Sequence, residues 1–136
     1  MHQIIQKGRL HSWDECTNYQ ASLSPPDPTW PADVRVVAAY IHANLFEIGL
    51  EVQNLRRECG TLDHNISARF TYYVGMGIKT YILSHRLSLA KQLLQIDGLK
   101  ITQIALAVGY ANPSAFTTTF RSHEGCSPSE FRERHR

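Results

Sequence analysis

The stretch Gly109–Arg132, GYANPSAFTTTFRSHEGCSPSEFR, contains the signals for two helices and the turns around them. Phe116 and Phe120 stand four residues apart, so both side chains lie on one face of a helix. Asn112 followed by Pro113 is a typical helix start, because asparagine caps free N–H groups and proline fits the first turn. The stretch therefore predicts a helix that begins at Asn112 and continues beyond Phe120.

Two further helices flank this one. After Gly125, Ser127 and Glu130 have the spacing of a capping box, which predicts a short helix at the C-terminal end. Upstream, an apolar stripe at helical spacing ends at Gly109, a natural helix stop. The stripe consists of Ile101, Ile104, Ala105 and Val108. The predicted order is helix, turn, helix, turn and short helix, which is typical of a helix-turn-helix unit.

The same pattern occurs earlier in the chain. Val52, Leu55, Cys59 and Gly60 match Ile101, Ile104, Val108 and Gly109 at a constant offset of 49 residues. Ile66, Phe70, Gly75 and Tyr81 match Phe116, Phe120, Gly125 and Phe131 at an offset of 50 residues. A single residue added in the second turn accounts for the change of offset. We infer that the chain contains an internal duplication.

The rest of the chain is also expected to be helical, since no segment alternates convincingly at the period of a strand. An apolar stripe from Ile78 to Leu94 predicts a long helix between the copies, and another helix runs from Val34 to Leu45. The fold class is therefore all-α, with about seven helices in two helix-turn-helix subdomains joined by a long connector helix.

The domain boundaries follow from these elements. The first subdomain covers residues 31–77, the connector helix 78–97 and the second subdomain 98–136. Residues 1–30 end in a proline-rich break. Two interpretations of this segment stay open: an arm packed on the first unit, or a linker remnant of an effector-binding domain.

Composition narrows the classes of function. The net charge of +2 divides into −3 for residues 1–55 and +5 for residues 56–136, which is compatible with a polyanionic partner or with a solvated basic surface. No apolar run approaches the roughly eighteen residues of a membrane span. Cys16, Cys59 and Cys126 are far apart and form no metal-ligand motif, so we expect neither zinc nor a disulfide framework, but a cytoplasmic protein.

A helix-turn-helix unit that binds DNA presents its second helix to the major groove. With about 100° per residue, the outward side chains can be assigned from the inward apolar ones. In the first unit they are His64 and Ala68, flanked by Ser67 and Thr71. In the second they are Ser114, Thr118 and Arg121, flanked by Ala115 and Thr117. Small outward side chains permit close approach to base edges and thymine methyl groups.

These residues carry a family resemblance. The motif Gly109-Tyr110, Phe116, Phe120, Gly125, Ser127-Pro128, Phe131-Arg132 resembles the C-terminal signature of the AraC/XylS family of bacterial transcription regulators. The segment SHRLSLAKQLLQ, with Arg86, Ala90, Leu93 and Leu94, resembles the linking helix of that family. The resemblance covers residues from about 32 to 132. It implies two units on one rigid body that engage successive major-groove segments of double-stranded DNA, often beside RNA polymerase.

The resemblance also implies site residues. The base-reading positions fall on His64, Ser67 and Ala68 in the first unit, and on Pro113, Ser114, Ala115, Thr117 and Thr118 in the second. Lys79, Arg86 and Arg121 are the candidates for contacts with the DNA backbone, although Arg86 could instead pin the two subdomains together by hydrogen bonds. The family often has arginine where this chain has Ala68 and Thr118, so tight readout of guanine is not expected here.

The sequence therefore predicts a sequence-specific DNA-binding transcription regulator that acts as a monomer, without cofactor, metal or enzymatic activity. The alternative is a protein-interaction module of the same fold, for example on RNA polymerase, because the two arginines are missing. An enzyme of the Ada type, a DNA-repair methyl acceptor, would need a zinc-held cysteine cluster, and the N-terminal part offers only Cys16.

Overall fold

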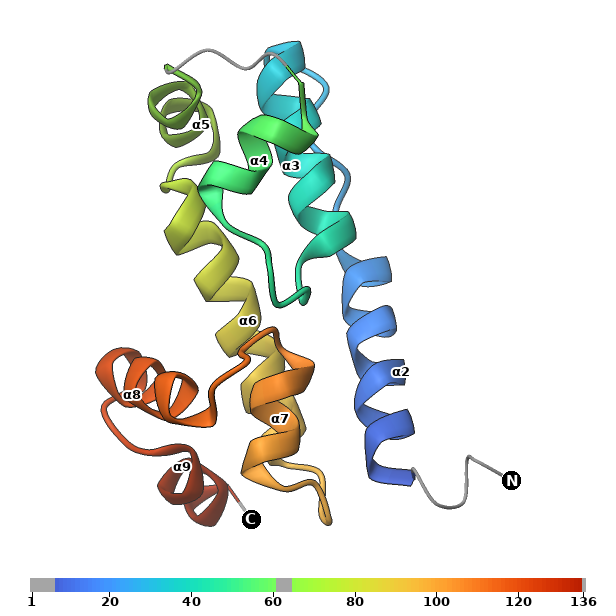
Figure 1. Cartoon of the computed structure of the whole chain (residues 1–136), viewed down its shortest axis with the longest axis vertical. Coiled ribbons are helices and arrows are strands. Elements are labelled where there is room, and N and C mark those ends of the chain that lie inside the picture. The colour runs from blue at the N-terminus through green and yellow to red at the C-terminus, as the bar shows by residue number, and fades with distance from the viewer. Residues whose placement is uncertain (1–6, 61–64, 136) are drawn as a thin grey trace.

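The computed structural model describes residues 7–60 and 65–135, and every regular element within them is a helix (Figure 1). An N-terminal helix, α2 (Lys7–Ser22), precedes a series of seven. These are α3 (Ala32–Asn44), α4 (Val52–Glu58), α5 (Ile66–Val74), α6 (Ile78–Leu94), α7 (Ile101–Ala107), α8 (Pro113–Glu124) and α9 (Pro128–Arg134). The series confirms the predicted all-α class. None of the helices in the described ranges has the length and apolar character needed to cross a membrane.

The two copies of the repeat have matching elements. α4 and α7 contain seven residues each, and their bounds differ by the same 49 positions at both ends. Gly75 and Gly125 end α5 and α8 with φ angles of 96° and 80°, a left-handed conformation that favours glycine. At the start of α9, the Ser127 N–H donates to Glu130 Oε1 at 2.8 Å, and the Glu130 N–H donates to Ser127 Oγ at 3.1 Å. The predicted capping box is thereby confirmed.

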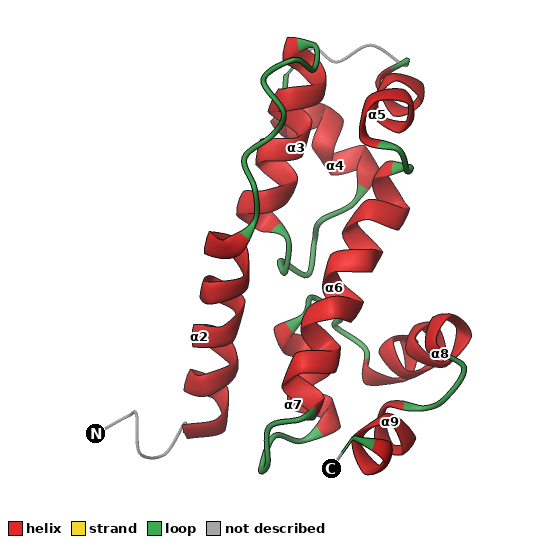
Figure 2. Ribbon diagram, turned by 180° about the vertical axis from the view of Figure 1, so that it is seen from behind, coloured by secondary structure: helices red, strands yellow, loops and turns green. Residues whose placement is uncertain are grey.

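The connector α6 passes through two hydrophobic cores. The first core combines α3, α4 and α5 with the start of α6, where Ile82 packs in the cluster that contains the fully buried Phe70. The second combines the end of α6 with α7, α8 and α9, where Leu87 joins the cluster around Phe120. Figure 2 shows α6 running from one group of helices into the other. Because both cores include its side chains, the connector fixes the two units on one frame.

Helix α2 packs along α6 and α7, on the side of the molecule away from α5 and α8 (Figures 1 and 2). The buried Cys16 thiol belongs to the second core and donates to the Ala107 carbonyl oxygen at 3.3 Å. Gln20 Nε2 donates to the His42 carbonyl oxygen in α3 at 3.0 Å. The arm therefore bridges both units and does not pack on the first one alone.

A half-buried cluster of two tyrosines and two histidines joins α2, α3 and α6. Tyr19 Oη lies 2.7 Å from His85 Nδ1, and Tyr81 Oη lies 2.6 Å from His42 Nε2. The Tyr81 and His85 rings meet edge to face, with centroids 4.8 Å apart. Burial lowers the pKa of both histidines, and the neighbouring His42 lowers the pKa of His85 further. This cluster is therefore most stable with both imidazoles neutral.

Candidate nucleic-acid interface

Helices α5 and α8, the second helices of the two units, lie along the same edge of the molecule (Figure 1). Each follows a turn that contains a glycine of positive φ, which is 88° at Gly60 and 106° at Gly109. Asn112 caps α8, since its Oδ1 accepts from the Ser114 N–H at 2.8 Å and Pro113 occupies the first position. The helix start predicted from the sequence is confirmed.

The predicted base-reading residues of α8 lie on or beside its exposed face, opposite the buried Phe116 and Phe120. Ser114, Ala115 and Thr118 are exposed, whereas Pro113 and Thr117 are half-buried. In the first unit Ser67 and Ala68 are exposed on α5, and His64 lies outside the described residues. Two rows of small outward side chains therefore line this edge, one on each unit.

Of the three predicted backbone contacts, Lys79 and Arg121 are exposed and Arg86 is not. The Arg86 side chain is buried in the interface between the units, and burial lowers the pKa of its guanidinium. Its Nε donates to the Leu45 carbonyl oxygen at 2.9 Å, and its Nη2 donates to that of Glu47 at 2.7 Å. These carbonyl partners and the burial favour the pin between the subdomains over a contact of Arg86 with DNA phosphate.

The guanidinium of Arg86 also touches the turn of the second unit. Its Nη1 lies 3.5 Å from the Gly109 carbonyl oxygen. A Cβ atom at Gly109 would lie 2.7 Å from Arg86 Cζ, closer than real Cβ contacts come. Glycine is therefore required here for the approach of Arg86 as well as for the φ angle. The other interpretation of Arg86, a pin between the subdomains, agrees with this geometry.

An open groove of about 1070 Å³ separates the two units on the side of the recognition helices. The start of α6 contributes Lys79 and Thr80 to it, and the two units contribute Ser67 on one side and Thr119 on the other. Lys79 places a positive charge in the groove, between α5 and α8. The groove therefore connects the two exposed rows into one continuous candidate surface.

A family model described as a helix-turn-helix domain matches residues 55–134, which include both recognition helices and the connector. The chain belongs to the AraC-type helix-turn-helix family. The resemblance that the sequence motifs carried is thereby confirmed.

Individual AraC-type relatives agree with this assignment. The bifunctional transcriptional activator/DNA repair enzyme AdaA of Bacillus subtilis is 31% identical over 108 residues, which make up 79% of this chain and 49% of that protein. The solved structure of a transcriptional regulator with an AraC-type DNA-binding domain, from Chromobacterium violaceum, is 29% identical with a TM-score of 0.61 and covers 76% of this chain and 91% of its own. The chain spans less than half the length of the first curated relatives that it matches.

A likeness of fold extends to the DNA-binding domain of AdpA, solved in complex with a target DNA. Its identity to this chain is 23%, its TM-score is 0.68, and the match covers 78% of this chain and 95% of that one.

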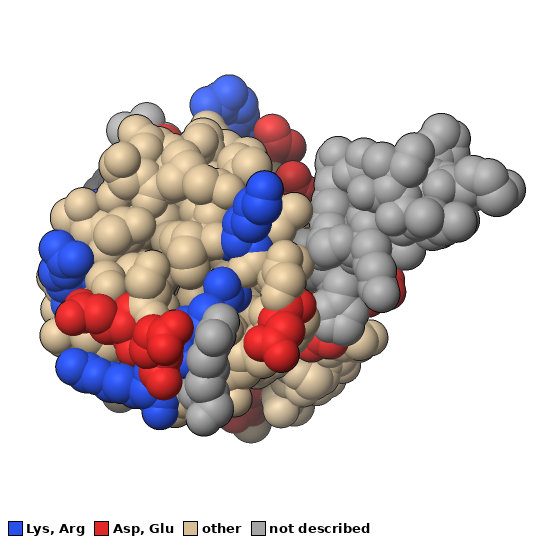
Figure 3. Space-filling model, turned by 90° about the horizontal axis from the view of Figure 1, so that it is seen from below, with Lys and Arg blue, Asp and Glu red and all other residues tan. Residues whose placement is uncertain are grey.

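The charged residues at the end of the molecule formed by the second unit do not form a single basic patch, because Lys and Arg alternate there with Asp and Glu (Figure 3). Lys91 Nζ lies 3.4 Å from Glu124 Oε1, and Arg69 of α5 is paired with Asp33 of α3. Part of the positive charge of residues 56–136 is therefore neutralised locally, so Lys79 and Arg121 become the main candidates for phosphate contacts.

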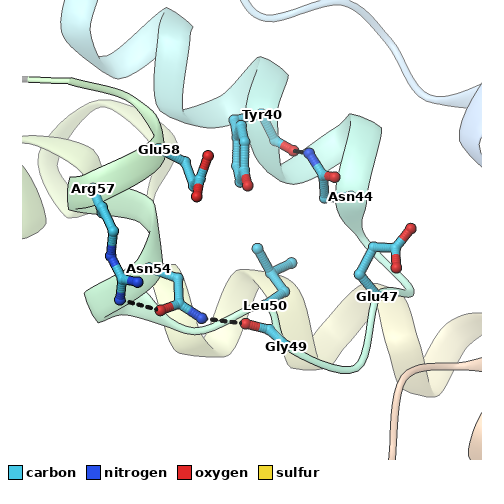
Figure 4. A pocket seen from close by; sticks show the side chains of 8 residues that line it. All are labelled: Tyr40, Asn44, Glu47, Gly49, Leu50, Asn54, Arg57 and Glu58. Atoms are coloured by element: carbon cyan, nitrogen blue, oxygen red, sulfur yellow. Dashed lines mark hydrogen bonds between the residues drawn. The ribbon is translucent and has the colours of Figure 1, made fainter.

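A second hollow, of about 250 Å³, lies between α3, α4 and the loop that joins them (Figure 4). Its polar side chains bond to neighbouring groups: Arg57 Nη2 donates to Asn54 Oδ1 at 2.9 Å, and Asn54 Nδ2 donates to the Gly49 carbonyl oxygen. Partial burial and the carboxylates of Glu58 and Glu47 raise the pKa of Tyr40 on its wall. No group of three metal-ligating side chains occurs among the described residues. We assign no chemistry to this hollow.

Proposed function

We propose that this chain is the DNA-binding part of a transcription regulator, and that α5 and α8 enter successive major-groove segments on one face of a duplex. The observation that carries the proposal is the pair of second helices along one edge, each with its predicted base-reading side chains on or beside its exposed face. Major-groove segments are about 34 Å apart along one face of B-DNA. The connector between the two units has 17 residues and is about 25 Å long.

The groove between the units would then hold the sugar–phosphate backbone that separates the two major-groove segments. Lys79 lies in this groove, and Arg121 lies on the exposed side of α8. Contacts of this kind position a protein on DNA, whereas Ser67, Ser114 and Thr118 are placed to distinguish bases.

The two units of one chain supply two reading helices, so we propose that a single copy forms the DNA-binding unit. It would act on chromosomal DNA in the bacterial cytoplasm, without a cofactor and without catalytic activity. RNA polymerase is a further predicted partner, to be contacted while the chain is bound beside a promoter.

Selection from a random duplex pool at about 100 mM salt tests the proposal. The expected result is two enriched sequence blocks whose centres lie about 10 base pairs apart, one for each unit. If the chain contacts about six phosphates, log K should fall against log salt with a slope of about −5. Absence of any enriched sequence, or binding that salt does not weaken, would contradict the proposal.

Two substitutions separate base reading from backbone contact. Thr118→Ala should relax the preference within one block and leave the other unchanged. Lys79→Ala should weaken binding to all sequences alike and reduce the salt slope by about one. If Thr118→Ala weakens binding to all sequences alike and Lys79→Ala relaxes the preference within one block, the roles of these two residues are exchanged.

A further inference from the structure

The recognition helix of the first unit exposes a large aromatic side chain that the sequence motifs did not single out. Tyr72 is 79% exposed, although it lies near the end of a helix whose Ile66 and Phe70 are fully buried. It follows Phe70 by two residues, about 200° around the helix, and Ala68 precedes Phe70 by the same interval. Ala68 and Tyr72 are therefore the two residues of α5 that point farthest from the core.

Two of the polar side chains beside these residues, Arg69 and Thr71, make contacts within the chain. Arg69 is the only basic residue in the sequence of α5, and it is ion-paired with Asp33 of α3. The Thr71 hydroxyl donates to the Ser67 carbonyl oxygen, one turn earlier, at 2.9 Å. The outward surface of α5 thus presents the Ala68 methyl group and the Tyr72 ring beside the exposed Ser67, without a basic side chain that could bind guanine.

The thymine methyl group is the apolar feature of the major groove, and alanine, the methyl group of threonine and aromatic side chains recognise it by contact. We propose that Ala68 and Tyr72 form an apolar strip that reads thymine methyl groups, so that the first unit selects a thymine-containing half-site. This inference rests on the proposed function, and it adds the chemical class of base that one unit prefers.

The Tyr72 ring lies against the ring of Tyr73. The two rings meet edge to face at an interplanar angle of 81°, with centroids 4.9 Å apart. Such a contact restricts the Tyr72 side chain before DNA arrives, so less conformational entropy is lost on binding.

The second unit has a different chemistry at the corresponding positions. Thr118 and Ser122 occupy the places of Ala68 and Tyr72, and both are exposed and hydroxylic. Arg121, also exposed, occupies the place of Thr71. The second half-site is therefore expected to depend more on hydrogen bonds and the first more on methyl groups, although the second unit also exposes the methyl groups of Ala115 and Thr118.

Deoxyuridine tests this assignment, because it lacks the methyl group of thymidine and pairs identically. The whole chain is titrated at about 100 mM salt with the duplex found by selection, after thymidine is replaced by deoxyuridine in one block at a time. In the first block, replacing one contacted thymidine should weaken binding about fourfold, because burial of one methyl group contributes about that factor to the affinity. The same replacement in the second block should weaken binding less than it does in the first block.

Variants distinguish a contact from a change in DNA shape. In Tyr72→Ala, the loss caused by deoxyuridine at the nearest position should shrink to less than twofold, whereas Tyr72→Phe should retain it. Ser122→Ala, the equivalent position of the second unit, should leave the thymine dependence as it is. Since Tyr72 is exposed, none of these changes disturbs the core.

Three results would overturn the inference. One is a first block without thymine, and another is equal sensitivity of the two blocks to deoxyuridine. The third is an unchanged deoxyuridine effect in Tyr72→Ala, which would assign the exposed ring to solvent or to a protein partner. A pool with no enriched sequence at all would instead contradict the proposed function, and this inference with it.

Discussion

The two helix-turn-helix units have the same order of helices and turns. The turn before the second helix, however, packs differently in each unit. Gly60 and Gly109 occupy equivalent positions, and both have positive φ angles. A Cβ atom at Gly60 would meet nothing within 4 Å, whereas one at Gly109 would collide with Arg86. Both copies of the duplicated sequence therefore keep the conformation of the turn, whereas close packing against the turn, by Arg86, occurs only in the second unit.

The helix that follows each recognition helix shows a second difference. α9 has seven residues and begins with the capping box of Ser127 and Glu130. Its counterpart α6 begins at Ile78, and the residue before it, Gly77, provides no side-chain cap, but α6 has 17 residues and packs in both cores. A short helix depends on its cap, whereas a long buried helix obtains most of its stability from packing. The comparison thus predicts which substitutions are costly in one unit and tolerated in the other.

The largest difference is expected between Gly109→Ala and Gly60→Ala. Both place a Cβ atom on a left-handed residue, which costs about 1–3 kcal/mol. Only Gly109→Ala also forces Arg86 out of its place, so its total cost should reach about 3–5 kcal/mol. Urea denaturation of the two variants measures the free energy of unfolding directly. Equal losses would mean that Arg86 moves aside freely.

Arg86→Met should be the next most harmful change. It leaves the carbonyl groups of Leu45 and Glu47 without the donors that now satisfy them, at a cost of about 2–4 kcal/mol. Because these contacts link the first unit to the connector, the unfolding transition should also lose cooperativity. Arg121→Met is the matched control on an exposed position, with an expected change within about 0.5 kcal/mol. Similar losses in both variants would contradict a structural role for Arg86.

Much of this fold could be predicted from the sequence, because local signals encode it. The bounds of α6 and the start of α8 at Asn112 follow from apolar spacing, glycine stops and capping residues. The equivalence of the two units follows from positions repeated at a constant offset. The outward positions of α5 and α8 follow from the same helical geometry.

The remaining features depend on long-range contacts that no local pattern reveals. Helix α2 has no apolar stripe at helical spacing, since its contacts come from isolated residues such as Cys16 and Tyr19. Arg86 lies on an amphipathic helix, where an arginine can reach solvent equally well. Only the tertiary structure shows that the carbonyl group of Leu45, 41 residues earlier in the chain, comes within 2.9 Å of it.

A smaller effect is expected from pH, at the junction where the arm meets the first unit. Burial lowers the pKa of His42 and His85 in the folded chain, whereas in the unfolded chain histidine titrates near pH 6.5. The unfolded state therefore binds more protons as the pH falls below about 6.5, and the folded state loses stability there. Urea midpoints at pH 7.5 and pH 5.5 measure this loss.

The matched variants for this pH effect are His85→Gln and His123→Gln. His85→Gln should flatten the difference between the two midpoints, while His123→Gln, at an exposed position of the second unit, should not. A urea midpoint that is independent of pH in the unmodified chain would show that folding does not change the protonation of His42 and His85.

The smallest effects should come from exchanging caps between the units. Ser127→Ala removes the serine cap of α9 and should cost about 1 kcal/mol. Gly77→Ser places the same cap on α6, where the backbone angles of φ −67° and ψ 161° suit any residue. The new Cβ atom would lie 3.8 Å from Thr71 Oγ1, an ordinary contact, and the hydroxyl could accept from the Thr80 N–H.

Gly77→Ser should therefore stabilise the chain by a few tenths of a kcal/mol, since glycine is only slightly worse than serine at this position. Thermal unfolding of the two variants beside the unmodified chain gives both values. A gain as large as the Ser127→Ala loss would mean that the start of α6 is held no better by packing than that of α9. No gain would mean that the two cores already fix the first turn of α6, and that the missing cap of the first unit costs the protein nothing.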